Sequence, residues 1–473
     1  MSAPRHDGRK PTAATLALAA LVAAAALPAA AQMSSSDAGA GSPAPTVQAL
    51  DLTAAVRLAR EHNPQVAEAD ANTDAAHAAK REAQLGRLPS VVARETAVRT
   101  TSPADVFGLE LMQERFSFPA FTQSDPNTPD PLNNYTSEIE VSVPLFTGGA
   151  LSAGIRQAGR MADAADAVRA HTARAVDLGV TQAYLGALLA GHFAELAEEA
   201  RATVAKHVEQ AQSFFDAGMI VESDLLQARV QLARMDEGLV RARNGERMAR
   251  AALNRAMGVD QGQEFALSEA PEAAAPRAAT LEEALALARA NRADLRASDR
   301  RVEAMKAGIA RAQAEYFPRI GVAARWDWND DNVFGTAGDS YTLVGRAEWN
   351  VWNWGQTSAR VAQSKGAYRA ADEARRSYAD QVELEVRGAW QAVEEARARR
   401  AATEGAVAAA ERAHSILEDR FTQGVAKVTD LLDAETMAHE QRVRDVQARF
   451  DLQQALRTLS FAIGDDPVAE VKP

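Results

Sequence analysis

The sequence predicts a mixed α and β membrane protein that is built from two copies of one structural unit. The chain begins with an export signal, most of the remainder is an internal repeat, and each copy combines two-faced strands with unusually long helical segments. Its 473 residues, of which 47% are hydrophobic and 25% are charged, have the composition of a chain that folds.

Residues 1–31 have the three parts of a secretory signal peptide. Basic residues precede the apolar run AATLALAALVAAAALP, and small residues lead to an expected cleavage after Ala31. A membrane anchor is the alternative, but this run is shorter than the roughly 20 residues that a spanning helix needs. The small and polar residues that follow predict a flexible N-terminal segment over 32–50.

The overall composition excludes several classes of protein. The 52 basic and 64 acidic side chains give a net charge of -12, so we expect no nucleic-acid partner. Cysteine is absent from the sequence, which excludes disulfides, thiolate metal sites and a cysteine-linked lipid anchor. The sequence also lacks an HExxH spacing, a Gly-x-Ser-x-Gly elbow and a phosphate loop after a strand. We therefore expect no enzyme, no cofactor and no metal site.

The repeat is visible in aligned stretches of the chain. LTAAVRLAREHN from Leu52 matches LEEALALARANR from Leu281, and VPLFTGG near Leu145 lies over the WNVWNWG stretch further on. The offset between the copies falls from 229 to 206 residues between Pro89 and Leu145, which predicts a 23-residue insertion in a loop of the first copy. The expected parts are a first repeat over 51–269, a linker over 270–280, a second repeat over 281–466 and a C-terminal tail over 467–473.

The hydrophobic period changes in the same order within each copy. Alternation from Ile320 to Trp328 is typical of a two-faced strand, whereas Val176, Val180 and Tyr184 repeat at helical spacing. The expected helices are 52–88, 150–217 and 224–257, then 281–317, 356–423 and 430–463. The expected strands are about 90–100 and 135–146, then about 319–329 and 341–352.

The lengths of these elements fit together. At 1.5 Å per residue each longest helix would reach roughly 100 Å, and the two shorter helices of a copy would stack beside it. The strands are close to the 9 to 11 residues, roughly, of a membrane-crossing strand. Four such strands in one chain leave open edges, so the sheet must close with strands of other chains.

Five of the six tryptophans lie in or beside the expected strands. We expect these side chains to lie at the membrane interfaces, where aromatic residues concentrate. The alternative is the core of a soluble sheet, where tryptophan is also common. The five residues are Trp326, Trp328, Trp349, Trp352 and Trp354.

Several stretches together resemble the TolC-like outer-membrane efflux proteins. They are VPLFTGG, FFDAGMIVESDLLQAR, RFTQGVAKVTDLLDAE and the insertion FGLELMQERFSF, placed in order within a two-fold duplication. The resemblance covers Leu52 to Gly464, which is almost the whole mature chain.

This resemblance implies a homotrimer in the outer membrane of a Gram-negative bacterium. Four strands from each chain would form a trimeric twelve-stranded β-barrel surrounded by outer-membrane lipid, and coiled-coil helices would continue it as a periplasmic α-helical barrel. Such a channel would be the exit duct of a tripartite efflux or secretion system, with a periplasmic adaptor protein and an inner-membrane transporter as partners. The alternative is an exported coiled-coil scaffold without channel activity.

The acidic residues at the two helical turns have two interpretations. At the start of the returning helices, Asp224, Asp430 and Asp433 would act as helix caps. The resemblance implies that Asp430 and Asp433 form acidic rings at the periplasmic entrance, and that Ser223 and Asp224 help to hold the entrance closed. Both interpretations can hold together, because a capping carboxylate can also face a lumen. The family's tyrosine and arginine partners are replaced here by Phe421 and by an alanine with a lysine beside it.

The residues of the turns themselves are expected to dock the adaptor, again by resemblance. Glycine at the end of each long helix would close the last helical turn, and the exposed apolar residues would supply the contact. The alternative is that these residues only pack the turn. The expected docking residues are Gly218, Met219, Ile220 and Val221, then Gly424, Val425, Ala426 and Lys427.

Overall fold

The structure is a computed structural model that describes residues 48–123 and 125–469. The expected signal peptide over 1–31 lies outside the described residues, as do most of the expected flexible segment over 32–50 and residues 470–473 of the tail. The described elements follow one another as two similar series.

The first series begins with a short strand and ends with a second one. Its elements are β1 (Gln48–Leu50), α2 (Leu52–His62), α3 (Pro64–Leu85), β2 (Ser90–Thr100), α4 (Pro103–Met112), α5 (Phe118–Gln123), β3 (Leu132–Phe146), α6 (Ala150–Asp216), α7 (Glu222–Met257) and β4 (Phe265–Leu267). The elements of the second series are α8 (Leu281–Asn291), α9 (Ala293–Gln313), the 3-10 turn η1 (Ala314–Tyr316), β5 (Arg319–Asp330), β6 (Asp339–Glu348), α10 (Gln356–Thr422) and α11 (Val428–Ala462).

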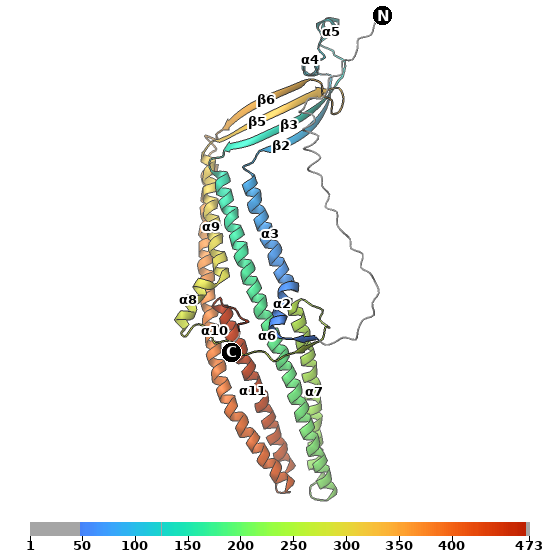
Figure 1. Cartoon of the computed structure of the whole chain (residues 1–473), viewed down its shortest axis with the longest axis vertical. Coiled ribbons are helices and arrows are strands. Elements are labelled where there is room, and N and C mark those ends of the chain that lie inside the picture. The colour runs from blue at the N-terminus through green and yellow to red at the C-terminus, as the bar shows by residue number, and fades with distance from the viewer. Residues whose placement is uncertain (1–47, 124, 470–473) are drawn as a thin grey trace. The chain divides into compact units, whose positions relative to one another are not determined.

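Strands β2, β3, β5 and β6 form one antiparallel sheet in the order β2-β3-β5-β6, which lies at one end of the long helices (Figure 1). The central pair, β3 and β5, joins the two copies, so each copy supplies one edge strand. The connection from β2 to β3 spans 101–131 and contains α4 and α5, while the connection from β5 to β6 spans only 331–338. The inserted residues of the first copy therefore lie in the β2–β3 connection, at the end of the molecule that carries the sheet (Figure 1).

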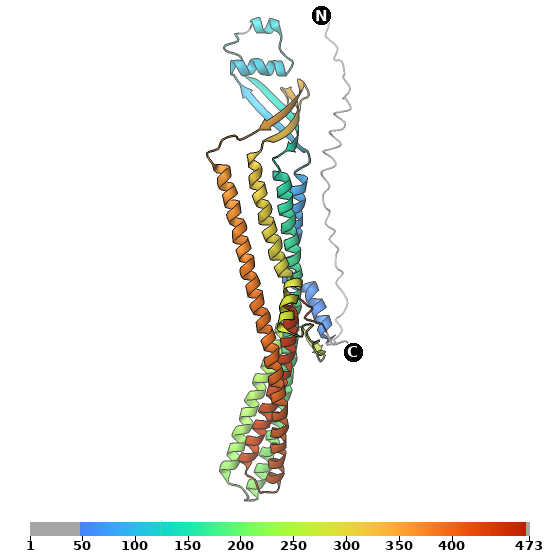
Figure 2. The same cartoon turned by 90° about the vertical axis from the view of Figure 1, so that its left-hand side faces the viewer.

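One long helix in each series packs beside three shorter helices (Figures 1 and 2). Helix α6 contacts α2 and α3 along one part of its length and α7 along the other, and α10 contacts α8, α9 and α11 in the same way. Helix α6 also contacts α9 and α11, which binds the two series together. The core is divided among clusters of mostly small and branched side chains along these contacts.

The helices expected over 52–88 and 281–317 are each broken, so their prediction as continuous helices is wrong. The breaks are at Asn63 and Arg292, which are extended with ψ of 124° and 122°. Proline at position 64 disfavours a helical conformation at Asn63, and the Asn63 side chain then caps α3 by accepting a hydrogen bond from the Gln65 amide.

Other boundaries differ from the expected ones by a few residues. Helices α7 and α11 begin two residues before the expected starts at 224 and 430, because residues beside the turns already continue the helix. The strand expected over 341–352 ends at Glu348, which pairs with Arg319 at the start of β5. Beyond that pair β5 offers no further partner, so the strand stops.

Strands β1 and β4 form a small parallel sheet that the sequence did not predict. Its residues 48–50 fall within the segment expected to be flexible. Three-residue strands are too short to show a period of two. The Tyr184 hydroxyl lies between them, 2.8 Å from the Leu50 carbonyl oxygen and 2.6 Å from that of Ser268.

Within the described part of the chain, the helices do not combine the length and the apolar character needed to cross a bilayer.

A buried ionic group surrounds the break at Arg292. The Asp294 carboxylate lies 2.5 Å from an Arg292 nitrogen and accepts a hydrogen bond of 2.8 Å from the Tyr378 hydroxyl. Both partners of the ion pair are less than 10% exposed. Burial alone would raise the pKa of Asp294, but the hydrogen bond and charge of Arg292 outweigh it and lower that pKa to about 2.

The two glycines at the ends of the long helices have the same left-handed conformation. Gly218 and Gly424 each have φ of 73°. The Gly424 amide donates to the Phe421 carbonyl, and the next amide donates to the Arg420 carbonyl, which is the hydrogen-bond pair of a Schellman ending. The expected role of these glycines in closing the last turn is therefore seen in both copies.

The ionic group predicts how stability depends on pH. A lowered pKa means that Asp294 contributes its stabilisation above its ordinary pKa of 3.8 and loses it as the pH falls toward 2. We expect Asp294→Asn to lower the free energy of unfolding by roughly 2 kcal/mol at pH 7 and to flatten its decline in acid. Thermal unfolding in detergent between pH 7 and pH 2 measures both effects. The matched control, Glu237→Gln, removes an exposed ion pair and should change little.

The left-handed turns predict a second effect. Because a Cβ at Gly424 would meet only the Met219 side chain at an ordinary 3.5 Å, the cost of Gly424→Ala is conformational. We expect a loss of about 1–2 kcal/mol in unfolding free energy. Gly405→Ala, in the open interior of α10, should instead add about 0.5–1 kcal/mol. Equal shifts for both variants would mean that the left-handed backbone of Gly424 does not set the cost.

Candidate gate, docking tips and membrane face

The hairpins α6–α7 and α10–α11 turn at the end of the helices that lies farthest from the sheet (Figure 1). An apolar cluster joins the two hairpins just above their turns, and Phe214 packs against Phe421 with ring centroids 5.3 Å apart. The side chain of Gln231 on α7 also donates to the Thr436 hydroxyl on α11 at 3.1 Å. These contacts hold the two turns near each other. The buried members of the cluster are Val204, Ala211, Leu225, Ala228, Phe421, Val428, Leu431 and Leu432.

Asp430 and Asp433 lie at the start of α11 and are both exposed. Their neighbours Leu431 and Leu432 are buried, so the helix is anchored with the two carboxylates turned away from the cluster. The N-cap is Lys427 and its side chain makes no capping hydrogen bond. Capping by Asp430 is therefore wrong for this helix, because the helix begins two residues earlier. Among the described residues, neither carboxylate forms an ion pair or a side-chain hydrogen bond, so both charges face outward.

Ser223 and Asp224 occupy the corresponding place in α7. Ser223 is exposed and Asp224 is half-buried in the first turn. The N-cap is Val221, so Asp224 does not cap this helix either. Its charge remains favourable near the N-terminus of the helix, where the dipole is positive.

The residues at the positions where the resemblance implies closing partners cannot make a tyrosine or arginine contact. Phe421 is only 2% exposed, and its ring is held within the apolar cluster. Ala426 is half-buried and has no polar side chain, while Lys427 is exposed. Any contact that holds this entrance closed must therefore differ from a tyrosine–arginine bond to Ser223 and Asp224.

The two turns present apolar side chains to solvent. Met219, Val221 and Val425 are each more than 60% exposed. Ile220 differs, because it packs against the apolar cluster instead. Each turn thus exposes apolar side chains to solvent next to the buried apolar cluster.

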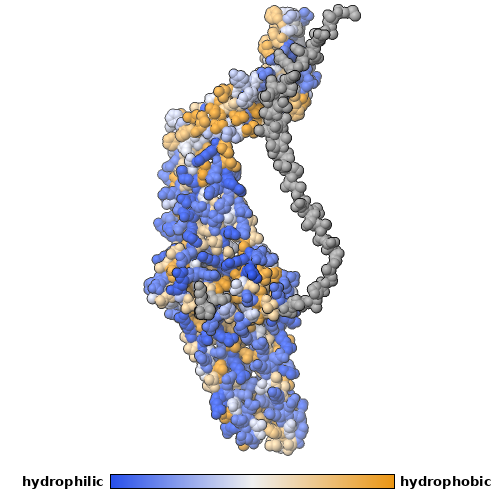
Figure 3. Space-filling view, viewed as in Figure 1, coloured by the Kyte–Doolittle hydropathy of each residue, from blue (hydrophilic) through white to orange (hydrophobic). Residues whose placement is uncertain are grey.

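The sheet has one apolar and one polar face. Because partners in an antiparallel pair share a face, the register sets Ile139 beside Trp326 and Trp326 beside Tyr341. On the other face Arg94 pairs with Glu138 at 2.6 Å. Figure 3 shows apolar residues gathered over the sheet, whereas the helices are largely hydrophilic. This division suits a sheet with lipid on one side and water on the other.

The tryptophans lie at two levels of the sheet. Trp326 and Trp328 are near the end of β5 that leads to the β5–β6 connection, and Trp326 is 45% exposed. Trp349, Trp352 and Trp354 follow β6 at the end that adjoins α10. Trp326 pairs with Tyr341, and Trp349 follows Tyr341 by eight residues, so the two levels are at least about 26 Å apart along the strand. This distance is on the order of the apolar band of a membrane barrel.

Two of these tryptophans have special surroundings. The Trp349 indole donates to the Tyr316 carbonyl at 3.1 Å. Trp354 is 87% exposed and has φ of 54°, a left-handed conformation that is uncommon for a side chain of this size. Its counterpart in the first copy is Gly148, with φ of 64°. The second copy thus places a large aromatic side chain at a position whose backbone favours glycine.

The structure also brings together three side chains that the sequence did not single out. His207, His414 and Glu435 offer ligand atoms that lie within 4.8 Å of one another. They come from three helices and have no local spacing, so no motif could have identified them. The sequence had predicted no metal site.

Comparisons with known proteins agree with this architecture. The sequence profile of the outer membrane efflux protein family matches residues 55–259 and 284–465. The outer membrane protein TolC of Vibrio cholerae serotype O1 is 25% identical over 311 residues, which cover 63% of this chain and 70% of that protein.

Two solved structures have a similar fold. One is a membrane protein from Pseudomonas aeruginosa, with 20% identity and a TM-score of 0.75 over 89% of this chain and 91% of that one. The other is the CmeC outer membrane channel of Campylobacter jejuni, with 16% identity and a TM-score of 0.74 over 87% and 85%. The expected combination of long helices with antiparallel strands and the two-copy organisation are confirmed. The chain belongs to the outer membrane efflux protein family and is a non-enzymatic outer-membrane channel of a tripartite efflux system, with a periplasmic helical extension.

Proposed function

We propose that three copies of this chain assemble to form the channel. The observation that carries this proposal is the sheet, whose edge strands β2 and β6 each pair on one side only within the chain. Unpaired backbone groups are costly in lipid, so β6 of one copy must pair with β2 of the next.

The number three is supported by two arguments. Two copies would give eight strands, and an eight-stranded barrel has an interior that side chains fill. Three copies give twelve strands and leave room for a lumen, which the polar face of the sheet would line. TolC-like channels are trimeric.

The assembly predicts a definite mass. Mature protein in detergent, measured by light scattering with the detergent contribution subtracted, should have three times the mass of one chain. The oligomer should withstand salt washing, because backbone pairing and apolar contacts hold it. A stable monomer in buffer without detergent would overturn the proposal, and a dimer would overturn the number.

We also propose that Asp430 and Asp433 form the acidic constriction at the periplasmic entrance. Both are exposed at the first turns of α11, and their charges are not neutralised by another described residue. Three-fold assembly would bring six carboxylates around one axis. Such a ring attracts cations and is blocked by multivalent ones.

The constriction predicts a change in conductance. Asp430→Ala combined with Asp433→Ala should raise single-channel conductance and weaken block by a trivalent cation at least about tenfold, because several favourable charge pairs are lost. Planar-bilayer recordings measure both quantities. Asp216→Ala is the matched control, since it removes an exposed acidic residue at the end of α6. Unchanged conductance in the double variant would show that the two residues do not line the narrowest point.

The turns are proposed as the docking surface for the periplasmic adaptor, through which the inner-membrane transporter would engage. Their exposed apolar residues are Met219, Val221 and Val425. These residues support a docking role because exposed apolar side chains that lie together mark sites where a protein partner can bury them. Gly218 and Gly424 fix the shape of each turn. Ser223 and Asp224 are proposed to belong to the gate and to hold the entrance closed through partners other than the tyrosine and arginine of the family.

A further inference from the structure

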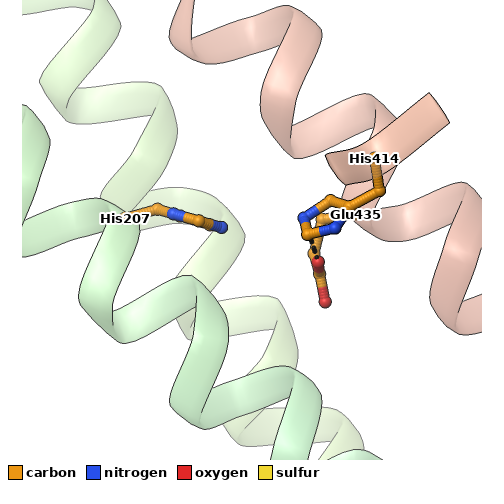
Figure 4. Close-up of side chains that lie close together, drawn as sticks. All are labelled: His207, His414 and Glu435. Carbon is orange, nitrogen blue, oxygen red and sulfur yellow. Dashed lines mark ion pairs between the residues drawn. The ribbon is translucent and has the colours of Figure 1, made fainter. Parts of the chain in front are cut away.

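His207, His414 and Glu435 lie together between the two hairpins (Figure 4). His207 comes from α6, His414 from α10 and Glu435 from α11. Their ligand atoms lie within 4.8 Å of one another. The group therefore spans the contact between the α6–α7 hairpin and the α10–α11 hairpin.

The imidazole of His207 is the unusual member. It is 2% exposed, and neither ring nitrogen has a well-aligned hydrogen-bond partner among the described residues. Burial lowers the pKa of His207, and it outweighs the nearby Gln210 side chain, which acts to raise that pKa. A buried polar atom without a partner costs about 1–3 kcal/mol, so its presence calls for an explanation.

The side chains of His414 and Glu435 lie close together, but their hydrogen bonding is incomplete. His414 Nε2 lies 2.7 Å from a Glu435 carboxylate oxygen, and both side chains are less than 15% exposed. The same nitrogen nevertheless has no well-aligned hydrogen bond. A plain histidine–glutamate ion pair would account for these two residues, but it leaves His207 beside the pair without a well-aligned hydrogen bond of its own.

The donor set fits a transition-metal ion. Two imidazoles and one carboxylate are ligands that Zn²⁺ uses, with water completing a four-coordinate site. Imidazole also suits Ni²⁺ and Cu²⁺, whereas Mg²⁺ and Ca²⁺ prefer oxygen ligands. Ligand atoms around tetrahedral Zn²⁺ lie about 3.4 Å apart, so small side-chain rotations would close the observed spread.

The surroundings favour such a site. Val204 and Ala211 flank His207 on α6, and both are fully buried in the apolar cluster. Leu431 and Leu432 lie one turn before Glu435 and belong to the same cluster. An apolar shell limits access of water, which strengthens the attraction between the ion and the carboxylate.

We propose that His207, His414 and Glu435 bind one divalent transition-metal ion of the Zn²⁺ class in each chain and thereby fasten the two hairpins together. The three residues lie seven to nine positions from the ends of their helices, about 11–14 Å along the axis. An ion there joins the hairpins just inside the turns. Its influence on channel opening rests on the proposed entrance, but the binding itself does not.

Binding is tested on the untagged full-length protein in detergent, with Zn²⁺ alone and with excess Mg²⁺ present to occupy exposed carboxylates. Calorimetry should give one Zn²⁺ per chain. His207→Ala and Glu435→Gln should each weaken binding at least about tenfold, since even indirect supports of a metal site are worth that much. His77→Ala is the matched control, because His77 forms an exposed pair with Asp166 and should leave binding unchanged.

A second variant tests the proposal independently of folding losses. The chain contains no cysteine, so His207→Cys introduces a single thiol at the site. Thiolate is a strong ligand for this class of ion, so binding should persist, and Co²⁺ should show thiolate-to-metal absorption. Absence of that absorption from the folded variant, equal affinity in His207→Ala, or no Zn²⁺ binding by the parent protein would each overturn the proposal.

Thermal unfolding distinguishes this site from the acidic constriction. Zn²⁺ should raise the thermal unfolding midpoint of the parent and of the Asp430→Ala, Asp433→Ala double variant, but not that of His207→Ala. Retention of the shift in the double variant separates this site from the acidic constriction. Loss of the shift in the double variant alone would place the metal at the constriction and contradict the proposed ligands.

Discussion

The backbone of the sheet imposes the constraint on which the rest of the structure depends. A membrane-crossing strand must have partners for its amide and carbonyl groups, because lipid offers none. Within the described residues the larger sheet has four strands, and its edge strands β2 and β6 remain open. The proposed assembly meets this constraint, and in it the polar face with Arg94 and Glu138 would line the lumen.

The arrangement of the strands also determines how the helices are placed. Each strand of the sheet leads into or out of a helix, so the spacing of the strands sets the spacing of the helices that follow. The stacked shorter helices fill the space beside α6 and α10 and allow each copy to return to its starting level. Because both copies obey this plan, the left-handed backbone positions recur in pairs, including Gly218 with Gly424.

Much of this architecture follows from the sequence. Alternation from Ile320 to Trp328 predicted a two-faced strand, and the change of offset predicted the insertion between β2 and β3. The breaks at Asn63 and Arg292 were missed. Pro64 gave a local signal for the first break, whereas the second depends on contacts of Arg292 with Asp294 and Glu385, which lie on two different helices. Local helix propensity does not predict a contact such as that with Glu385, because it forms only when α10 packs against this segment.

The candidate site divides in the same way. The turns and their acidic residues carry sequence signals, because glycine, apolar tip and carboxylate follow one another at fixed spacing. The group formed by His207, His414 and Glu435 has none, since only the packing of three helices brings it together. The sequence also did not predict which side chains are buried. Phe421 occupies a position for which the resemblance implies a polar partner, and its burial follows from contacts with the opposite hairpin.

The extra segment between β2 and β3 has a consequence for the far side of the membrane. Within it Phe107, Phe116 and Phe121 form a small aromatic nucleus, with centroids 5.3–5.7 Å apart. The corresponding β5–β6 connection of the second copy is short. In a ring of three chains, long and short connections would therefore alternate around the barrel. The outer mouth of the channel would then carry three equivalent aromatic clusters rather than six. A ligand that recognises this cluster would bind with a stoichiometry of three per channel.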